Sequence, residues 1–226
     1  MHRWGLPPSG APACFFRPIR VILVFSSRFS CHQIWRYRIF IVYLQANCDD
    51  MDALRLSRIM EGLPGVSPIE GTNLYENCIV MLCKRKHHSP VMLHLEGIRQ
   101  EDCPLSWEGE LNEQLERTYN DTESLTERSA VCVSLLLALE LTDYTVIERS
   151  RKGTGFDYML GEKSDLFYMP KARLEISGIE QESESNNIER RYRLKLQQTD
   201  KSDDMRMPAY VSIVEFSTPK ALFGIK

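Results

Sequence analysis

The chain lacks the sequence features of several large protein classes. Its seven cysteines form no CxxC pair and show neither the spacing of a disulfide framework nor that of a zinc ribbon. An odd and scattered set of cysteines is typical of reduced thiols in a core, which predicts a cytoplasmic protein. The two apolar runs near the N-terminus, 21–25 and 39–44, are far shorter than the roughly 20 residues of a membrane span, so we expect no membrane partner.

A strong charge of one sign is also missing. The 28 basic and 31 acidic residues leave a net charge of −3, so no global basic field indicates nucleic acid. The distribution is uneven, because residues 1–48 contain six arginines and no acid. We expect residues 1–50 to be either sequence upstream of a biological start at Met51 or a poorly ordered basic extension. Residues 51–226 are expected to form a single α/β domain.

The sequence has no nucleotide-binding loop, because GxxxxGK[ST] does not occur and the Gly-Thr-Gly of residues 153–155 is too short for one. Cys78 and Cys83, together with His87 and His88, have the residue types of a metal site. The two cysteines flank an apolar run, however, and we interpret them as strand residues. Residues 78–83 and 91–98 then predict a β-hairpin, with the two histidines solvated in its loop.

The remaining segments predict a mixed sheet with helices. A helix is expected from Thr122 or Ser124 to Leu141, and Glu127 completes the spacing of a capping box after Ser124. Alternating or apolar patterns predict strands within 145–160, 171–179 and 209–219, and a polar helix is expected within 182–204. The predicted fold is therefore α/β, a mixed central sheet flanked by helices, with the hairpin as an N-terminal extension.

Two acids lie on neighbouring predicted strands. Asp157 follows the Gly-Thr-Gly turn, and Glu175 lies in the next alternating strand. An aspartate and a glutamate on adjacent strands have the hard oxygen ligands that a divalent metal such as Mg²⁺ prefers. Two alternatives stay open: Asp157 satisfies the backbone of the turn, and Glu175 is an exposed residue of an edge strand.

The order of these elements resembles the core of the PD-(D/E)XK nuclease superfamily over residues 122–218. The resemblance implies a restriction-endonuclease-like core in which Asp157 and Glu175 are ligands of Mg²⁺ and Glu127 is a helix acid that assists through a water. The metal would lower the pKa of the attacking water and neutralise charge on the phosphate. The implied function is Mg²⁺-dependent hydrolysis of phosphodiester bonds in nucleic acid.

The chain departs from the family pattern at one position. Serine stands at Ser177, where the family has a lysine that positions or activates the attacking water, and serine carries no positive charge. Either the lysine has moved, to Lys195 on the following helix or to Lys152 before the turn, or the fold no longer cuts. In some members a glutamine of the following helix adds a polar contact, which would fall to Gln197 or Gln198.

Basic side chains on both sides of the acids predict contacts with nucleic-acid phosphates. The candidates are Arg149, Arg151, Lys152, Arg191 and Arg193. The alternative is a solvated helix face paired with Glu182, Glu184 and Glu189. Arg190 and Lys195 belong to the same basic run.

Two further hypotheses compete with the nuclease. In one, the chain is a catalytically inactive α/β module that binds a protein partner or an effector, and both acids are structural. In the other, it is a scaffold of an obligate complex. The nuclease hypothesis requires the carboxylates of Asp157 and Glu175 to lie within about 5 Å of each other, because both must reach one cation. It also requires Lys195 or Lys152 nearby.

Overall fold

The computed structural model of the chain describes residues 53–226, so the predictions for residues 1–50 fall outside the described residues. The strands are β1 (Leu54–Arg55), β2 (Val91–Gly97), β3 (Glu101–Ser106), β4 (Thr145–Arg149), β5 (Tyr158–Lys163), β6 (Tyr168–Ile179), β7 (Ala209–Glu215) and β8 (Lys220–Ile225). The α-helices are α1 (Pro68–Lys84), α2 (Glu113–Thr118), α3 (Thr122–Leu141) and α4 (Ile188–Gln198). Two 3₁₀ helices, η1 (Leu56–Glu61) and η2 (Thr199–Met205), complete the set in this part of the chain.

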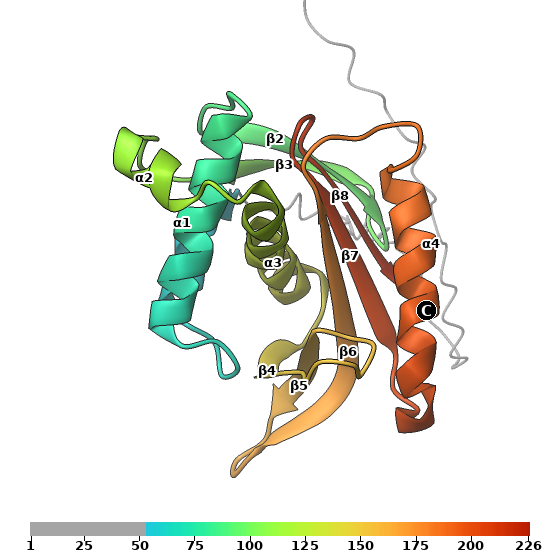
Figure 1. Cartoon of the computed structure of the whole chain (residues 1–226). Coiled ribbons are helices and arrows are strands. Elements are labelled where there is room, and N and C mark those ends of the chain that lie inside the picture. Colours follow the sequence, from blue (N-terminus) through green and yellow to red (C-terminus); the bar gives the residue numbers. More distant parts are fainter. Residues whose placement is uncertain (1–52) are drawn as a thin grey trace, which may run out of the picture. The chain divides into compact units, whose positions relative to one another are not determined.

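All eight strands of the described residues belong to one mixed sheet, in the order β1-β3-β2-β8-β7-β6-β5-β4. The strands β4, β5 and β6 are antiparallel, β6 and β7 are parallel, β7 and β8 are antiparallel, and β8 runs parallel to β2. Figure 1 shows α1 and α3 on one side of this sheet and α4 on the other. The predicted mixed α/β class is confirmed.

The predicted strand at residues 78–83 is wrong, because these residues lie in α1. Ser67 caps the helix by accepting a hydrogen bond from the backbone N–H of Glu70, and Pro68 occupies its first turn. The run from Cys78 to Leu82 is buried on every side, against α3 and the first 3₁₀ helix, so it has no polar face that would reveal a helical period.

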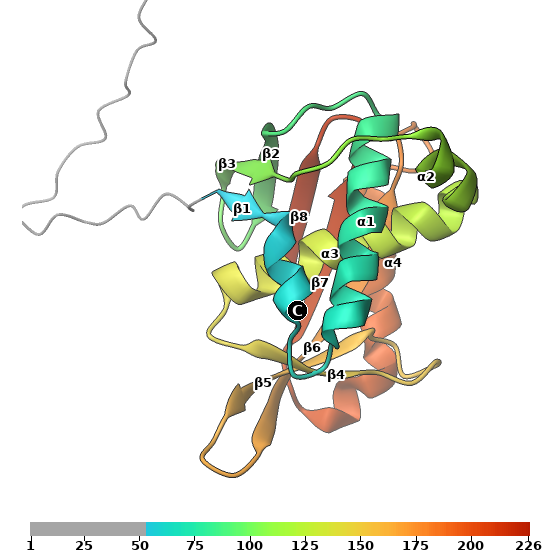
Figure 2. The same ribbon diagram turned by 90° about the vertical axis from the view of Figure 1, so that its left-hand side faces the viewer.

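A hairpin does form after α1, but from the strands β2 and β3 and not from the predicted residues 78–83 and 91–98. The strand β2 pairs with β3, and β3 comes from the polar stretch that follows residue 100. Figure 2 shows this pair beside β1, to the left of α1 in this view. The predicted N-terminal hairpin of residues 78–98 is therefore replaced by a helix followed by a hairpin of residues 91–106.

The helix α3 confirms the prediction for residues 122–141, but the predicted N-cap, Thr122 or Ser124, is wrong. Asp121 is the N-cap, and its carboxylate accepts from the backbone N–H groups of Glu123 and Ser124. The helix is buried over most of its surface, because α1 covers one side and β6 and β7 cover the other. Within residues 53–226, no helix has both the length and the apolar character that a membrane crossing requires.

The opposite face of the sheet packs against α4. Ile188, Tyr192 and Leu196 of α4 contact an apolar cluster that includes Ile179 and Val211 on the strands. These three residues form the inward face of the helix. On the same face, β6 carries polar residues at the alternate positions 173, 175 and 177. All three are buried.

The Gly-Thr-Gly turn between β4 and β5 touches the end of α4. Gly155 has φ +87°, and a Cβ atom at this position would lie 2.5 Å from the carbonyl oxygen of Gln198. Gly153 also has a positive φ, +98°, but a Cβ atom there would meet nothing within 4 Å. Only Gly155 is therefore needed for the close approach of the turn to α4.

We predict that Gly155→Ala destabilises the protein much more than Gly153→Ala. Both substitutions place a side chain at positive φ, which costs about 1–2 kcal/mol, and Gly155→Ala adds an overlap with backbone that costs about 1–3 kcal/mol more. Chemical denaturation of the two variants measures the difference. Equal losses of stability would show that the turn does not pack against α4 in solution.

Candidate functional site

The sheet register places Asp157 opposite Glu175. Tyr158, the first residue of β5, pairs with Leu174 of the antiparallel strand β6. Asp157 directly precedes β5, and its backbone N–H donates to the carbonyl oxygen of Leu174 at 2.8 Å. Directly opposed residues of an antiparallel pair share one face of the sheet. The Asp157 carboxylate is held in turn, because its Oδ2 accepts from the backbone N–H of Ile176 at 2.8 Å.

Glu175 is 0% exposed, on a central strand of the sheet. The edge-strand alternative is therefore wrong. Its Oε1 accepts from Lys195 Nζ at 2.5 Å and from Gln198 Nε2 at 2.7 Å, and both donors come from the last turn of α4. Its Oε2 is buried and has no hydrogen-bond partner among the described residues.

The electrostatic environment raises the pKa of Glu175 to about 7. Burial is the largest cause, since a carboxylate loses its hydration there, and the charge of the nearby Asp157 carboxylate is the next. A hydrogen bond and the charge of Lys195 act in the opposite direction but do not cancel these effects. Lys195 therefore offsets only part of the cost of ionising Glu175.

Of the two lysines expected to replace the family lysine, Lys195 lies at the acids. Lys195 also donates to the side-chain oxygen of Gln198 at 3.3 Å, so the lysine, the glutamine and Glu175 form one hydrogen-bonded cluster. Lys152 is exposed in the turn before Asp157, and no contact joins it to Glu175 in the described part of the chain. Gln198 makes the glutamine contact, whereas Gln197 is exposed.

An arginine of α4 contacts Ser177. Arg191 of α4 donates from Nη1 to the hydroxyl oxygen of Ser177 at 3.1 Å. It also donates from Nε and Nη2 to Oδ1 of Asn186, at 3.2 and 2.7 Å. Ser177 is buried, and Arg191 is partly buried.

The third buried polar residue of this row, Arg173, is tied to the segment after α4. Its Nη1 donates to the carbonyl oxygen of Thr199 and to the hydroxyl of Ser202, and its Nη2 donates to the carbonyl oxygen of Met207 and to Asp203. Arg173 therefore anchors the end of α4 against β6. Residues 173, 175 and 177 together fix the helix along the strand through polar contacts.

A groove of about 480 Å³ runs along α4 next to these contacts. It is lined by Ser185, Asn186, Arg190, Arg191, Leu194, Lys195 and Gln198. Three of these side chains are basic and none is acidic, so the groove is suited to an anion. Lys195 and Gln198 connect the groove directly with the buried carboxylate of Glu175.

The other predicted site residues lie further out. Glu127 is exposed on α3, and no hydrogen bond or ion pair joins it to the two acids among the described residues. Arg149, Arg151 and Arg193 are exposed. The expected ion pairs between the α4 arginines and the nearby glutamates are not formed within residues 53–226, where Glu182 pairs with Lys220 instead.

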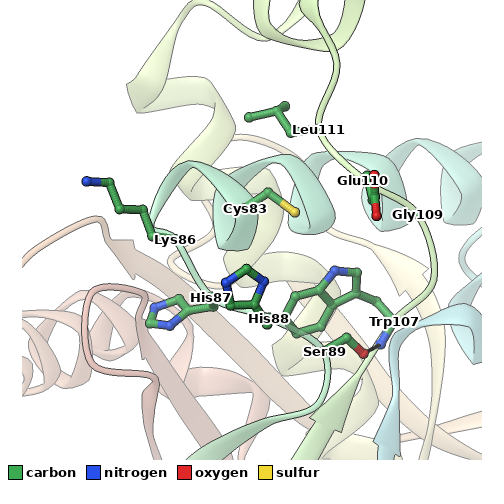
Figure 3. A pocket seen from close by; sticks show the side chains of 9 residues that line it. All are labelled: Cys83, Lys86, His87, His88, Ser89, Trp107, Gly109, Glu110 and Leu111. Carbon is green, nitrogen blue, oxygen red and sulfur yellow. Dashed lines mark hydrogen bonds between the residues drawn. The ribbon is translucent and has the colours of Figure 1, made fainter.

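A second hollow, of about 660 Å³, lies at the C-terminal end of α1 (Figure 3). Cys83, His87 and His88 line it together with Trp107, but the Nε2 atom of His87 lies 2.8 Å from the carbonyl oxygen of Phe216. Cys78 is buried in α1 instead. Residues 53–226 contain no group of three or more His, Cys, Asp or Glu side chains arranged to hold a metal, so the Cys/His alternative is not supported.

No protein-family model matches the chain, and neither the curated proteins nor the solved structures include one with significant similarity to it. The site therefore has to be interpreted from its own geometry. Sequence reasoning named both acids, Lys195, Gln198 and Arg191, but it missed Asn186 and Arg173. The alternation of Arg173, Glu175 and Ser177 along one strand was the available signal for a buried polar row.

We predict that Glu175→Gln stabilises the metal-free protein at pH 8. The folded state raises the pKa of Glu175 from 4.5 to about 7, so the folded protein binds the proton more tightly than the unfolded chain. Stability therefore falls as pH rises from about 4.5 to 7, and the amide avoids this cost. The expected gain is on the order of 1–3 kcal/mol at pH 8 and close to zero near pH 4.5.

Glu215 provides the matched control. It is also 0% exposed, and burial acts to raise its pKa, but hydrogen bonds from Ser217 and Thr218 lower it below the ordinary value. Glu215→Gln should therefore lose stability at pH 8. Denaturation in EDTA at several pH values measures both variants. A loss of stability in Glu175→Gln at pH 8 would identify the contact with Lys195 as a structural ion pair.

Proposed function

We propose that the protein is a Mg²⁺-dependent nuclease that hydrolyses phosphodiester bonds. The observation that carries this proposal is the state of Glu175, which is buried beside Asp157 and contacts Lys195, and one of whose oxygens has no partner among residues 53–226. A buried, unsatisfied carboxylate oxygen costs stability. Such costs are typical of functional sites, where ligand binding rather than folding satisfies the group.

The donor set fits Mg²⁺. Oε2 of Glu175 and the Asp157 carboxylate are hard oxygen ligands, and a divalent cation between them would give Oε2 a partner and offset their mutual repulsion. No third acidic, histidine or cysteine side chain completes a cage in the described residues. Mg²⁺ commonly uses one or two carboxylates and fills its other positions with waters and substrate phosphates.

Mg²⁺ held by Asp157 and Glu175 would supply a water of lowered pKa and would neutralise charge on the phosphate. The protein's own residues position the reaction. Asp157 is oriented by the backbone N–H of Ile176, and Glu175 by Gln198 and Lys195. Lys195 brings a positive charge to the acids. It takes the place of the lysine that the family pattern has at the position of Ser177.

The order of the elements also supports the proposal. The elements α3, β4, β5, β6, α4 and β7 follow one another in the order that the resemblance to the PD-(D/E)XK superfamily implies. Asp157 lies at the start of the second strand and Glu175 within the third. Glu127 lies on the first helix, but its exposed side chain adds no support for the role of the assisting acid.

The basic residues of α4 would bind the substrate. Arg190, Arg191 and Lys195 line the groove beside the acids, while the exposed side chains of Arg149, Arg151, Lys152 and Arg193 are not part of its lining. Phosphate contacts supply most of the affinity of non-specific nucleic-acid binding, and they do not need a positive net charge of the whole protein. The substrate is therefore proposed to be a nucleic acid that lies along α4.

One observation favours the second candidate function, in which the chain is an inactive module that binds a protein partner. The tip of the β5–β6 hairpin carries exposed large apolar side chains, with Leu166 at 91% and Phe167 at 60%. Exposed apolar groups of this size are common at protein interfaces. In that function the contact between Glu175 and Lys195 is structural, and Glu175→Gln lowers stability at pH 8.

We predict that the full chain binds Mn²⁺ or Mg²⁺ more tightly as pH rises from 6 to 8. A protonated carboxyl group is a poor ligand, and the pKa of Glu175 lies at about 7. The affinity should therefore fall about tenfold between pH 7.5 and pH 6. Isothermal titration calorimetry measures this dependence, and a pH-independent affinity would contradict a role of Glu175 as a ligand.

Asp157→Asn and Glu175→Gln are expected to abolish metal binding and the cleavage of DNA and RNA oligonucleotides by the Mn²⁺-loaded protein. Glu148→Gln removes an exposed acid from the neighbouring strand β4 and is the matched control, which should leave both properties unchanged. If the parent binds no divalent metal at pH 8, the proposal is wrong and the acids are structural.

A further inference from the structure

Arg191 is held rigidly at the groove by neutral partners. Oδ1 of Asn186 accepts from Nε and Nη2, and the hydroxyl oxygen of Ser177 accepts from Nη1. Because one contact comes from the loop before α4 and the other from β6, the guanidinium plane is fixed from two sides. Such preorganisation removes most of the side-chain entropy that an arginine otherwise loses on binding a ligand.

The positive charge of Arg191 is not neutralised within residues 53–226. No carboxylate lies within ion-pair distance of it in the described part of the chain, although the residue is partly buried. The other partly buried arginines of the fold differ: Arg128 pairs with Glu70, and Arg85 pairs with Glu180. An immobilised, unpaired guanidinium at the wall of a groove is an anion site without its anion.

Two N–H groups of Arg191 remain for a ligand. A guanidinium has five N–H donors, and the contacts with Asn186 and Ser177 use Nε, Nη1 and Nη2 once each. One N–H on each terminal nitrogen is therefore left without a partner in the described residues. A pair of donors on one guanidinium fits the oxygens of a phosphate group.

We propose that Arg191 binds a phosphate oxygen of the substrate and supplies, at Ser177, the positive charge that the serine cannot. The inference rests on the proposed function and deepens it. In the family pattern one lysine stands at this strand position. In this chain its place is divided between two residues of α4, with Lys195 on the Glu175 carboxylate and Arg191 beside Ser177, free to contact the phosphate.

The chemistry assigns different tasks to the two residues. An arginine stays protonated throughout the pH range of the protein, so Arg191 cannot take a proton from water. It binds and neutralises a non-bridging phosphate oxygen, where negative charge increases as the attacking oxygen approaches. The positioning of water remains with Lys195 and the carboxylate pair.

The test uses the full chain and separates binding from cleavage. Binding of a fluorescent 20-nucleotide single strand and of its duplex is measured in EDTA at several NaCl concentrations. Arg191→Ala should weaken binding about tenfold and reduce the salt slope by about one. Arg117→Ala removes an exposed arginine from α2 and is the matched control, which should behave like the parent.

Cleavage with Mn²⁺ provides the second readout. Arg191→Ala should lower kcat at least 100-fold, Arg191→Lys should lose less, and the double variant S177K/R191A should recover activity relative to R191A alone. Recovery by a lysine at position 177 would show that cleavage needs a positive charge at this place. It would also show that cleavage does not need the hydrogen bonds that Arg191 makes with Asn186 and Ser177. Thermal unfolding establishes that each variant is folded.

The outcomes distinguish the inference from the proposed function. If the parent cleaves nucleic acid and a folded Arg191→Ala binds and cleaves like the parent, the inference is overturned and Arg191 only fastens α4 to β6. If the parent neither binds nor cleaves nucleic acid, the proposed function fails, and calorimetry with inorganic phosphate decides the inference. Phosphate binding that Arg191→Ala abolishes would uphold the anion site, and no phosphate binding by the parent would overturn it.

Discussion

The contact of Lys195 and Gln198 with the buried carboxylate of Glu175 is the interaction on which the candidate site depends. It joins the end of α4 to the centre of β6, and the register of β5 brings Asp157 to the same place. Polar contacts of this kind add little net stability when buried, because desolvation opposes the attraction of the charges. Their effect is to fix the position of α4 along the sheet, which determines what the groove presents to a ligand.

The two fully buried glutamates of the fold show how environment separates structure from function. Glu215 receives hydrogen bonds from Ser217 and Thr218 in the turn that follows it, and these lower its pKa. Glu175 has a raised pKa, and one of its oxygens has no partner among residues 53–226. Burial is complete in both cases, so burial alone does not mark a site. The difference lies in whether the protein itself satisfies the charged form.

Much of the C-terminal half could be predicted from the sequence, because its strands alternate and its helices have caps or a clear polar face. Asp157 and Glu175 were identified because each lies in or beside such a pattern. Lys195 and Gln198 were named because the family resemblance implies a lysine and a glutamine on the helix that follows. The region of Cys78 to Leu82 failed for the opposite reason, since a helix that is apolar all round has no period to recognise. Asn186 could not be predicted, because its role depends on a loop conformation that only the packing of α4 against β6 determines.

The parallel pairing of β8 with β2 has a consequence for how the chain folds. Among the strands of residues 53–226, β8 is the last in sequence and is inserted between β2 and β7. Within this part of the chain it is the one strand that connects the β1-β3-β2 part of the sheet to the part that carries the acids. During synthesis the two parts cannot become one sheet until residues 220–225 have left the ribosome. Contacts of such large sequence separation form late and slowly, which makes β8 the segment whose arrival completes the fold.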